Sequence, residues 1–282
     1  MTSQAVVYEP GAVARVIINR PERKNAQSAL VLSELEQAFE RVVRDPEVRV
    51  IVLSGAGQHF SSGHDLGSPE HLETIEAHNR GLDQFGLSVQ RNDLYLESHL
   101  RLRNLLKPTV AMVQGYCVYG GWAIASAMDC IFVADDALLM PIYGGFATAP
   151  WDVGARKAKE ILFENRFMTA SEALQWGFVN RVHPAAELEQ KTLAYAARVA
   201  EKDSAFLCDI KFGINQTLDM MGFTTSVRTL TPTLMRQSEQ PAPEGARLHA
   251  SRSIVRDRVQ RALDYLREDE PSLAPPAKPR AG

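Results

Sequence analysis

Two glycine-containing turns in this chain have residue types that could bind a negatively charged oxygen through backbone N–H groups. The first is SSGHDL, residues 61–66, which follows an apolar run ending at Leu53. The second is the pair Gly120-Gly121, which follows the apolar β-branched run 110–113 and opens a stretch typical of a buried helix. Glycine lets a ligand approach bare backbone amides, and a helix N-terminus is partially positive. If both turns converge on one carbonyl oxygen, they form an oxyanion hole.

The segments around these turns alternate between strand-like and helical patterns. This alternation indicates βαβ units, and therefore an α/β fold with parallel strands. Strands are predicted over residues 13–19, 48–53, 110–113 and 130–134, and helices over 33–43, 154–163, 187–202, 206–221 and 251–267. The polar, helical segment 68–106 is expected to cover the pocket.

Four segments, in this order along the chain, resemble the crotonase (enoyl-CoA hydratase/isomerase) superfamily. They are IINRPERKNAQS at 17–28, VRVIVLSGAGQHFSSGHDL at 48–66, KPTVAMVQGYCVYGGWAIASAMDC at 107–130 and FMTASEALQWGFVNRV at 167–182. The resemblance implies a crotonase-like ββα spiral core with an acyl-CoA site over residues 1–186, and a C-terminal helical trimerisation region over 187–268. It also implies a homotrimer or a hexamer. The Pro-rich tail, 269–282, is expected to be disordered.

The resemblance further implies that the substrate is an acyl-CoA thioester. Its carbonyl oxygen would accept hydrogen bonds from the backbone N–H groups of His64 and Gly120, which would stabilise an enolate. The adenine and pantetheine portions would lie along the backbone near Lys24, Ser62, Asp65 and Leu66. Lys24 is also compatible with a solvated surface charge, and Asp65 with a turn residue. Coenzyme A is then part of the substrate, and no separate cofactor or metal is expected.

The sequence departs from the family pattern where typical hydratases carry two catalytic glutamates. The first of these positions is Ala123, and alignment places Tyr143 at the second. Without these glutamates the usual addition of water cannot proceed, since no group at either position holds the water and shuttles its proton. The acid or base must therefore come from another residue, or the reaction differs.

Asp152, in APWDVG, is the leading candidate for the missing acid or base. Dehalogenases of the superfamily carry a catalytic aspartate at or beside this position. The alternative is a helix N-cap, and the dipole of the helix predicted at 154–163 would keep the carboxylate ionised. The Tyr143 phenol and the His64 ring are further candidates, although each is also compatible with a structural role.

Aromatic residues surround the second turn. Tyr116 and Tyr119 flank it, and Trp122 and Trp151 are expected to form a flat aromatic wall that would suit a bulky or cyclic acyl group.

Three functions follow from these observations. The leading one is an acyl-CoA hydratase or isomerase, a lyase-like enzyme with a substituted acid/base set. The second is another crotonase reaction through the same oxyanion hole, namely C–C bond hydrolysis, decarboxylation or dehalogenation using Asp152. The third is a catalytically weak acyl-CoA-binding homologue.

The composition limits the classes of partner that the chain is expected to bind. The chain has 282 residues, 45% hydrophobic and 23% charged, and its net charge of −3 gives no reason to expect nucleic acid. The sequence contains neither an uncharged apolar run of membrane-spanning length nor a secretory signal, so the expected location is the cytoplasm, without membrane association. Three scattered cysteines favour reduced thiols over a disulfide framework or a zinc site.

Overall fold

The computed structural model describes residues 4–141, 146–230 and 252–271, and its centre is a six-stranded sheet. The strands lie in the order β1 (Val6–Glu9), β2 (Val13–Ile18), β3 (Val50–Gly55), β4 (Thr109–Val113), β6 (Cys130–Ala134) and β9 (Arg181–His183). Strand β1 is antiparallel to β2, and every other neighbouring pair is parallel. The predicted α/β class and the four predicted strands are confirmed.

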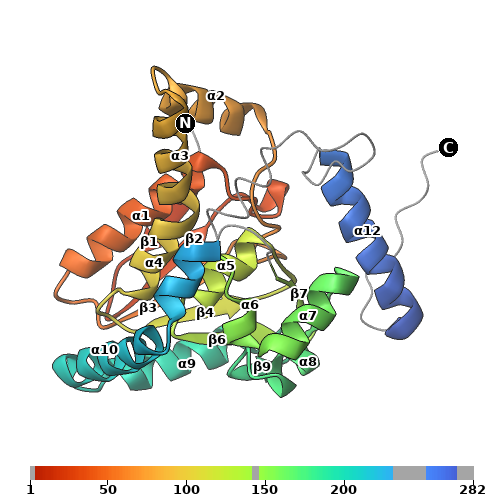
Figure 1. Cartoon of the computed structure of the whole chain (residues 1–282). Coiled ribbons are helices and arrows are strands. Elements are labelled where there is room, and N and C mark those ends of the chain that lie inside the picture. The colour runs from red at the N-terminus through yellow and green to blue at the C-terminus, as the bar shows by residue number, and fades with distance from the viewer. Residues whose placement is uncertain (1–3, 142–145, 231–251, 272–282) are drawn as a thin grey trace.

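Helices cover both faces of this sheet, as parallel strands require. Figure 1 shows α1 (Ala29–Arg44) and α4 (Ser98–Arg103) on one side, and α9 (Leu188–Ala200) and α10 (Ser204–Met220) on the other. Helix α1 begins where Ser28 accepts a hydrogen bond from the Val31 N–H, and it buries an apolar stripe that includes Leu35 and Phe39. The described residues include no helix that is long and apolar enough to cross a membrane.

A second, three-stranded sheet lies beside the first and shapes the site. It consists of β5 (Tyr116–Val118), β7 (Leu138–Met140) and β8 (Met168–Thr169). Helix α12 (Arg252–Asp269) packs its Ala262 and Leu266 side chains against this sheet. These short strands, together with β1 and β9, were missed by the sequence analysis because two to four residues do not establish a period.

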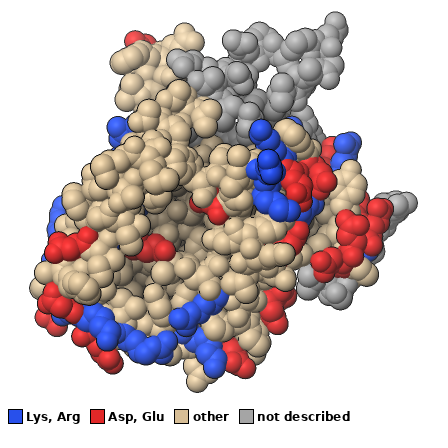
Figure 2. All heavy atoms as spheres, turned by 60° about the horizontal axis from the view of Figure 1, so that its bottom comes forward, with Lys and Arg blue, Asp and Glu red and all other residues tan. Residues whose placement is uncertain are grey.

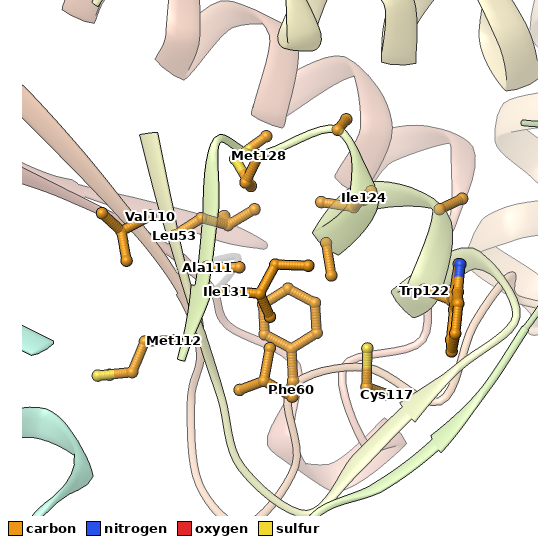
Figure 3. Close-up of a cluster of buried hydrophobic side chains, with 14 of the residues drawn as sticks. Leu53, Phe60, Val110, Ala111, Met112, Cys117, Trp122, Ile124, Met128 and Ile131 are labelled. Atoms are coloured by element: carbon orange, nitrogen blue, oxygen red, sulfur yellow. The ribbon is translucent and has the colours of Figure 1, made fainter. Parts of the chain in front are cut away.

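The core between the sheet and α5 (Gly120–Ser126) fixes the position of the glycine turn. Leu53 and Ala111 from the sheet, Phe60 from the following loop and Ile124 from α5 are all completely buried. Figure 3 shows Phe60 between the sheet residues and α5, with Trp122 at the edge of the cluster. Because α5 is anchored by this cluster, packing fixes the position of its first residues, Gly120 and Gly121.

The segment predicted to cover the pocket forms three helices, with a π-helical turn between the second and the third. Helices α2 (Pro69–Asn79) and α3 (Gln84–Asn92) bury none of their side chains. The π-helix at Asp93–Glu97 then leads into α4, and it buries Leu96. Single π-helical turns inside helices are frequent at functional sites.

Three further helices lie between β7 and β9 in chain order. They are α6 (Ala149–Asp152), α7 (Ala155–Glu164) and α8 (Ala170–Gln175). Helix α9 packs across β2, β3, β4, β6 and β9. The boundary placed after residue 186 stays a prediction, and most of the tail 269–282 lies outside the described residues.

Charged side chains of both signs lie on one face of the molecule. Figure 2 shows groups of Lys and Arg and groups of Asp and Glu on this face, separated by wide areas of other residues. The three cysteines are free, and Cys117 is buried. Within residues 4–141, 146–230 and 252–271, no group of three or more His, Cys, Asp or Glu side chains is arranged to hold a metal ion.

Candidate active site

The two glycine turns lie against each other. The loop of the first turn runs between the N-terminal segment and β5, where Gln27 N–H donates to Gly63 O (2.8 Å) and Ser61 N–H to Tyr116 O (2.9 Å). These bonds form short parallel bridges, Gln27 to His64 and Ser61 to Cys117. In such a bridge the His64 N–H points away from Gln27, and within the described residues no acceptor pairs with it.

Steric contacts show why both turns need glycine. Gly63 has a φ of +95°, and a Cβ there would lie 2.8 Å from Val118 O and 3.3 Å from Gly120 N. A Cβ on Gly120 would lie 2.5 Å from Gln27 Oε1 and 2.9 Å from His64 Nδ1. With standard bond lengths, the amide nitrogens of His64 and Gly120 are then at most about 7 Å apart. That spacing is compatible with two donors that share one oxygen.

Tyr119, the residue before Gly120, is held in a strained backbone conformation. Its φ of 49° and ψ of −103° lie outside the regions that non-glycine residues normally adopt. Its phenol contacts Asn165 Oδ1 at 3.2 Å, and its N–H donates to Met140 O. Such strain persists only where surrounding contacts fix it, and it clusters at functional sites. The contacts of Tyr119 therefore orient the first amides of α5.

The His64 ring is enclosed against the second turn. It packs edge-on against Tyr95 of the π-helix, with ring centroids 4.8 Å apart. Burial lowers the pKa of His64 to about 4, with a smaller contribution from His71, so the ring is neutral at pH 7. Its Nδ1 atom is buried with no partner in the described structure.

Asp152 is bound by side chains and does not cap α7. It is the last residue of α6, whereas the N-cap of α7 is Gly154, so the N-cap interpretation is wrong. The Trp122 indole N–H (2.9 Å) and the Thr148 hydroxyl (2.6 Å) both donate to its Oδ2 atom. Burial raises the pKa of Asp152 to about 6, although these two hydrogen bonds oppose the shift. The pKa of Asp152 therefore lies above the ordinary carboxyl value, and the group is still mostly ionised at pH 7.

The two tryptophans do not form one wall. Trp122 is completely buried, and its ring is stacked on Phe178 with centroids 3.7 Å apart. Trp151 is half-buried, donates to Ser226 Oγ (2.9 Å) and packs edge-on against Phe223. Trp122 thus acts as the donor that orients Asp152 and has no face free for an acyl group.

Lys24 and Ser62, two of the residues expected near coenzyme A, are in contact in the structure. Lys24 is exposed, with its Nζ 4.9 Å from the centroid of the Tyr116 ring, and the Ser62 N–H donates to Lys24 O. Leu66 is 44% exposed. Tyr116 is stacked on His59 on one side, so its ring is already partly covered.

Asp65 has a structural role in this loop. Its carboxylate accepts from the Ser68 hydroxyl and from the amides of Gly67 and Ser68, and it pairs with Arg20 at 3.1 Å. These hydrogen bonds hold the pKa of Asp65 down at about 2 although burial raises it. Arg20 was missed by the sequence analysis, since nothing in its neighbourhood distinguishes a buried arginine from a solvated one.

Of the two positions where the family carries glutamates, only Ala123 lies within the described residues. Ala123 lies on α5 and is buried, so this position offers no group that transfers a proton. Tyr143 lies outside the described residues. Phe146, which follows the gap, stacks on His99 with centroids 5.3 Å apart.

His99 is a second buried histidine that the sequence analysis did not select. Burial lowers the pKa of its ring to about 3, and His64 contributes to this shift. It also lies on the wall of a cavity of about 280 Å³ between α1 and α4, which is lined mainly by apolar side chains such as Leu35, Phe39 and Ile124. Its signal in the sequence is only a histidine inside an apolar helical pattern, which is not specific.

With this fold and these turns established, comparison with known proteins identifies the class. A family model described as enoyl-CoA hydratase/isomerase matches residues 9–240. The chain belongs to this family, and so to the crotonase superfamily.

Individual relatives support the same assignment. A putative enoyl-CoA hydratase, EchA13, of Mycobacterium tuberculosis is 35% identical over an alignment of 241 residues that covers 78% of this chain and 75% of the relative. A hydroxycinnamoyl-CoA hydratase-lyase of Pseudomonas fluorescens is 29% identical over 222 residues, 74% of this chain and 76% of the relative. The crystal structure of a probable enoyl-CoA hydratase from Mycobacterium thermoresistibile matches with a TM-score of 0.72 and 38% identity, covering 83% of this chain and 97% of the other.

Proposed function

We propose that this protein binds an acyl-CoA thioester and stabilises its enolate between the backbone N–H groups of His64 and Gly120. The observation that carries the proposal is the contact between the two glycine turns, where Gly63 and Gly120 leave no room for a side chain. Gly120 is the first residue of α5, where an amide has no acceptor inside the helix. An enolate oxygen is the partner that two such donors favour.

The reaction class is that of an acyl-CoA hydratase or isomerase whose usual glutamates are replaced by Ala123 and Tyr143. Asp152 is the acid/base group that this proposal assigns. A pKa near 6 lies close to the operating pH, which suits a group that must both take and return a proton. The Trp122 and Thr148 donors hold its Oδ2 atom in one place.

The alternative reactions differ in what Asp152 does. In dehalogenation it would be the nucleophile, and in C–C bond hydrolysis or decarboxylation it would be a base or an electrostatic group. A weak acyl-CoA binder would leave Asp152 without a chemical role. The hydroxycinnamoyl-CoA relative makes aryl thioesters worth including in any test.

Substrate turnover tests this proposal. The full chain is incubated with enoyl-, 3-oxo- and aryl-CoA thioesters in deuterated water, and the products are analysed by mass spectrometry. We expect deuterium at the thioester Cα atom together with one converted substrate. Binding of the thioesters without exchange or conversion would favour the weak binder, and absence of both would reject the proposal.

The proposed assembly is a homotrimer or a hexamer. Helix α10 exposes large apolar side chains, namely Phe206, Ile210, Phe212, Ile214 and Met220. An apolar face of this kind needs a partner surface. Light scattering is expected to give three or six times the chain mass of 31.2 kDa, and a stable monomer at micromolar concentration would contradict the assembly. The cytoplasmic location stays a prediction.

A further inference from the structure

Helix α2 is attached to the start of α1 by side chains of its first turn. The Ser28 hydroxyl donates to Glu70 Oε1 (3.0 Å), and the Ala29 N–H donates to His71 Nδ1 (3.2 Å). Arg20 pairs with Glu70 at 3.1 Å. Among the described residues, no other side chain of α2 makes a hydrogen bond or ion pair outside the helix, and none is buried. The attachment of α2 therefore depends on Glu70 and His71.

The contact with Ala29 fixes the protonation state of His71. A backbone N–H can only donate, so His71 Nδ1 must present a lone pair, and the proton of the neutral ring lies on Nε2. Ala29 is the first residue of α1, where an amide has no acceptor inside the helix. His71 therefore supplies an acceptor that α1 itself lacks, beside the Ser28 hydroxyl, which accepts from the Val31 N–H.

The start of α2 is also bound to the loop that follows the first glycine turn. Arg20 pairs with Asp65 as well as with Glu70, each at 3.1 Å. Asp65 in turn accepts from the hydroxyl of Ser68, which is the N-cap of α2. His64 therefore lies one residue before a carboxylate that is bound both to a buried arginine and to the start of α2. A displacement of this end of α2 would displace the turn.

We infer that His71 is a positioning residue, which in its neutral form fastens α2 to α1 and so holds the turn that carries His64, and that protonation of its ring releases this contact. The charged ring has a hydrogen on Nδ1, so two donors would face each other at the distance of the present hydrogen bond. The N-terminus of α1 is partially positive, and its first turn contains no acidic residue that would offset the repulsion. The inference rests on the proposed function, in which the His64 N–H is an oxyanion donor.

Four ionisable side chains surround His71. Burial lowers the pKa of His71, and Asp65 has the largest opposing effect. Arg20 lowers this pKa further, and Glu70 raises it. His64 is the fourth, and its own ring is neutral at pH 7. The net shift is downward, so the His71 ring is largely neutral at pH 7. Once α2 is released the ring regains its ordinary pKa, so a falling pH favours the released state.

Amide hydrogen exchange of the full chain without substrate measures the release of α2. After correction for the intrinsic pH dependence of exchange, the protection of α2 and of the Ala29 amide is expected to fall below about pH 6.5, by up to about 10-fold per pH unit. His71→Asn keeps an acceptor oxygen near the place of Nδ1 but cannot be protonated, so it is expected to flatten this dependence. His71→Ala removes the acceptor and should give low protection at every pH.

His78→Asn is the matched control, because it makes the same change in the last turn of α2, where His78 Nδ1 contacts only Thr74 O of the same helix (2.7 Å). It should leave the protection of α2 as in the wild type.

Steady-state kinetics test the positioning role on whichever enoyl-, 3-oxo- or aryl-CoA thioester the wild type converts. His71→Ala is expected to lower kcat about 10-fold at pH 7 with little change in KM, because a less precisely held turn stabilises the transition state less, and His71→Asn should restore most of kcat. Wild-type protection that does not vary with pH, a dependence that His71→Asn retains in full, or an unchanged kcat in His71→Ala would overturn the inference. If His71→Ala does not fold, the wild type and His71→Asn decide. Because exchange needs no substrate, its result stands even if no acyl-CoA is converted.

Discussion

The paired glycine turns and the Asp152 carboxylate differ in what fixes their reacting atoms. At the turns the donors are backbone amides, and close packing of Gly63 against Gly120 sets their positions. At Asp152 the reacting atom is a side-chain oxygen, held by donors from α5 and from the residue before α6. The turns therefore depend on the absence of side chains, and the carboxylate depends on the presence of particular ones.

This difference predicts how each region tolerates change. A substitution at the turns either removes a donor or displaces the loop, so intermediate effects are not expected. The pKa of Asp152 is instead set by two opposing effects. Burial raises it, and the two hydrogen bonds lower it. Substitutions around it should give graded effects that depend on pH.

The largest effect is expected from Gly120→Pro. Proline removes the backbone N–H, and its ring would meet Gln27 Oε1 and the His64 ring. Loss of one oxyanion donor lowers kcat by about 100- to 1000-fold, and the collision adds to this. We expect activity below about 0.1% of wild type in steady-state assays. Proline is tolerated at the first position of a helix, so circular dichroism should show a folded protein.

Gly213→Ala is the control for a glycine substitution elsewhere. Gly213 lies inside α10, and a Cβ there would meet nothing within 4 Å. Activity should stay at the wild-type level, and stability should rise by up to about 1 kcal/mol. Substantial activity in a folded Gly120→Pro protein would show that the N–H of Gly120 is not an oxyanion donor.

The same contrast explains what the sequence could predict. The parallel strands and the pair of glycine turns follow from local patterns, since apolar runs and glycines carry their own signal. The partner of Asp152 did not follow, because Trp122 lies 30 residues earlier and only the packing of α5 brings its indole nitrogen to the carboxylate. Gln27 and His99 were missed for the same reason, since a lone polar residue in the sequence gives no sign of what it faces when buried.

The next largest effect is expected from Asp152→Asn. Loss of a general base lowers kcat by about 100-fold or more, and the amide oxygen can still accept from Trp122 and Thr148. Steady-state kinetics beside thermal unfolding would separate chemistry from folding. Wild-type turnover in a folded Asp152→Asn enzyme would remove Asp152 from the mechanism and leave Tyr143 and the His64 ring as candidates.

The same variant should change how stability depends on pH. The pKa of Asp152 is about 6 in the folded protein, above its ordinary value of 3.8, so the native state holds the proton more tightly than the unfolded chain. Wild-type stability is therefore lowered as pH rises from about 4 to 6, and Asp152→Asn lacks this loss. We expect Asp152→Asn to gain roughly 1 to 3 kcal/mol relative to wild type between pH 4 and pH 7. Urea unfolding at both pH values measures this gain, and a constant difference would mean that the carboxyl group is not desolvated.

The smallest effect is expected from Trp122→Phe, which removes one donor to Asp152 but keeps the ring that stacks on Phe178. The indole N–H stabilises the carboxylate, so its loss should raise the pKa of Asp152 further above 6. If Asp152 acts as a base, the ionised fraction near pH 6.5 falls, and kcat should drop about 3- to 10-fold there and recover toward pH 8. Trp151→Phe is the matched control, because it loses a bond to Ser226 and none to Asp152. An acid limb that moves equally in both variants would reflect general loosening around the helices, whereas a shift confined to Trp122→Phe would assign that limb to Asp152.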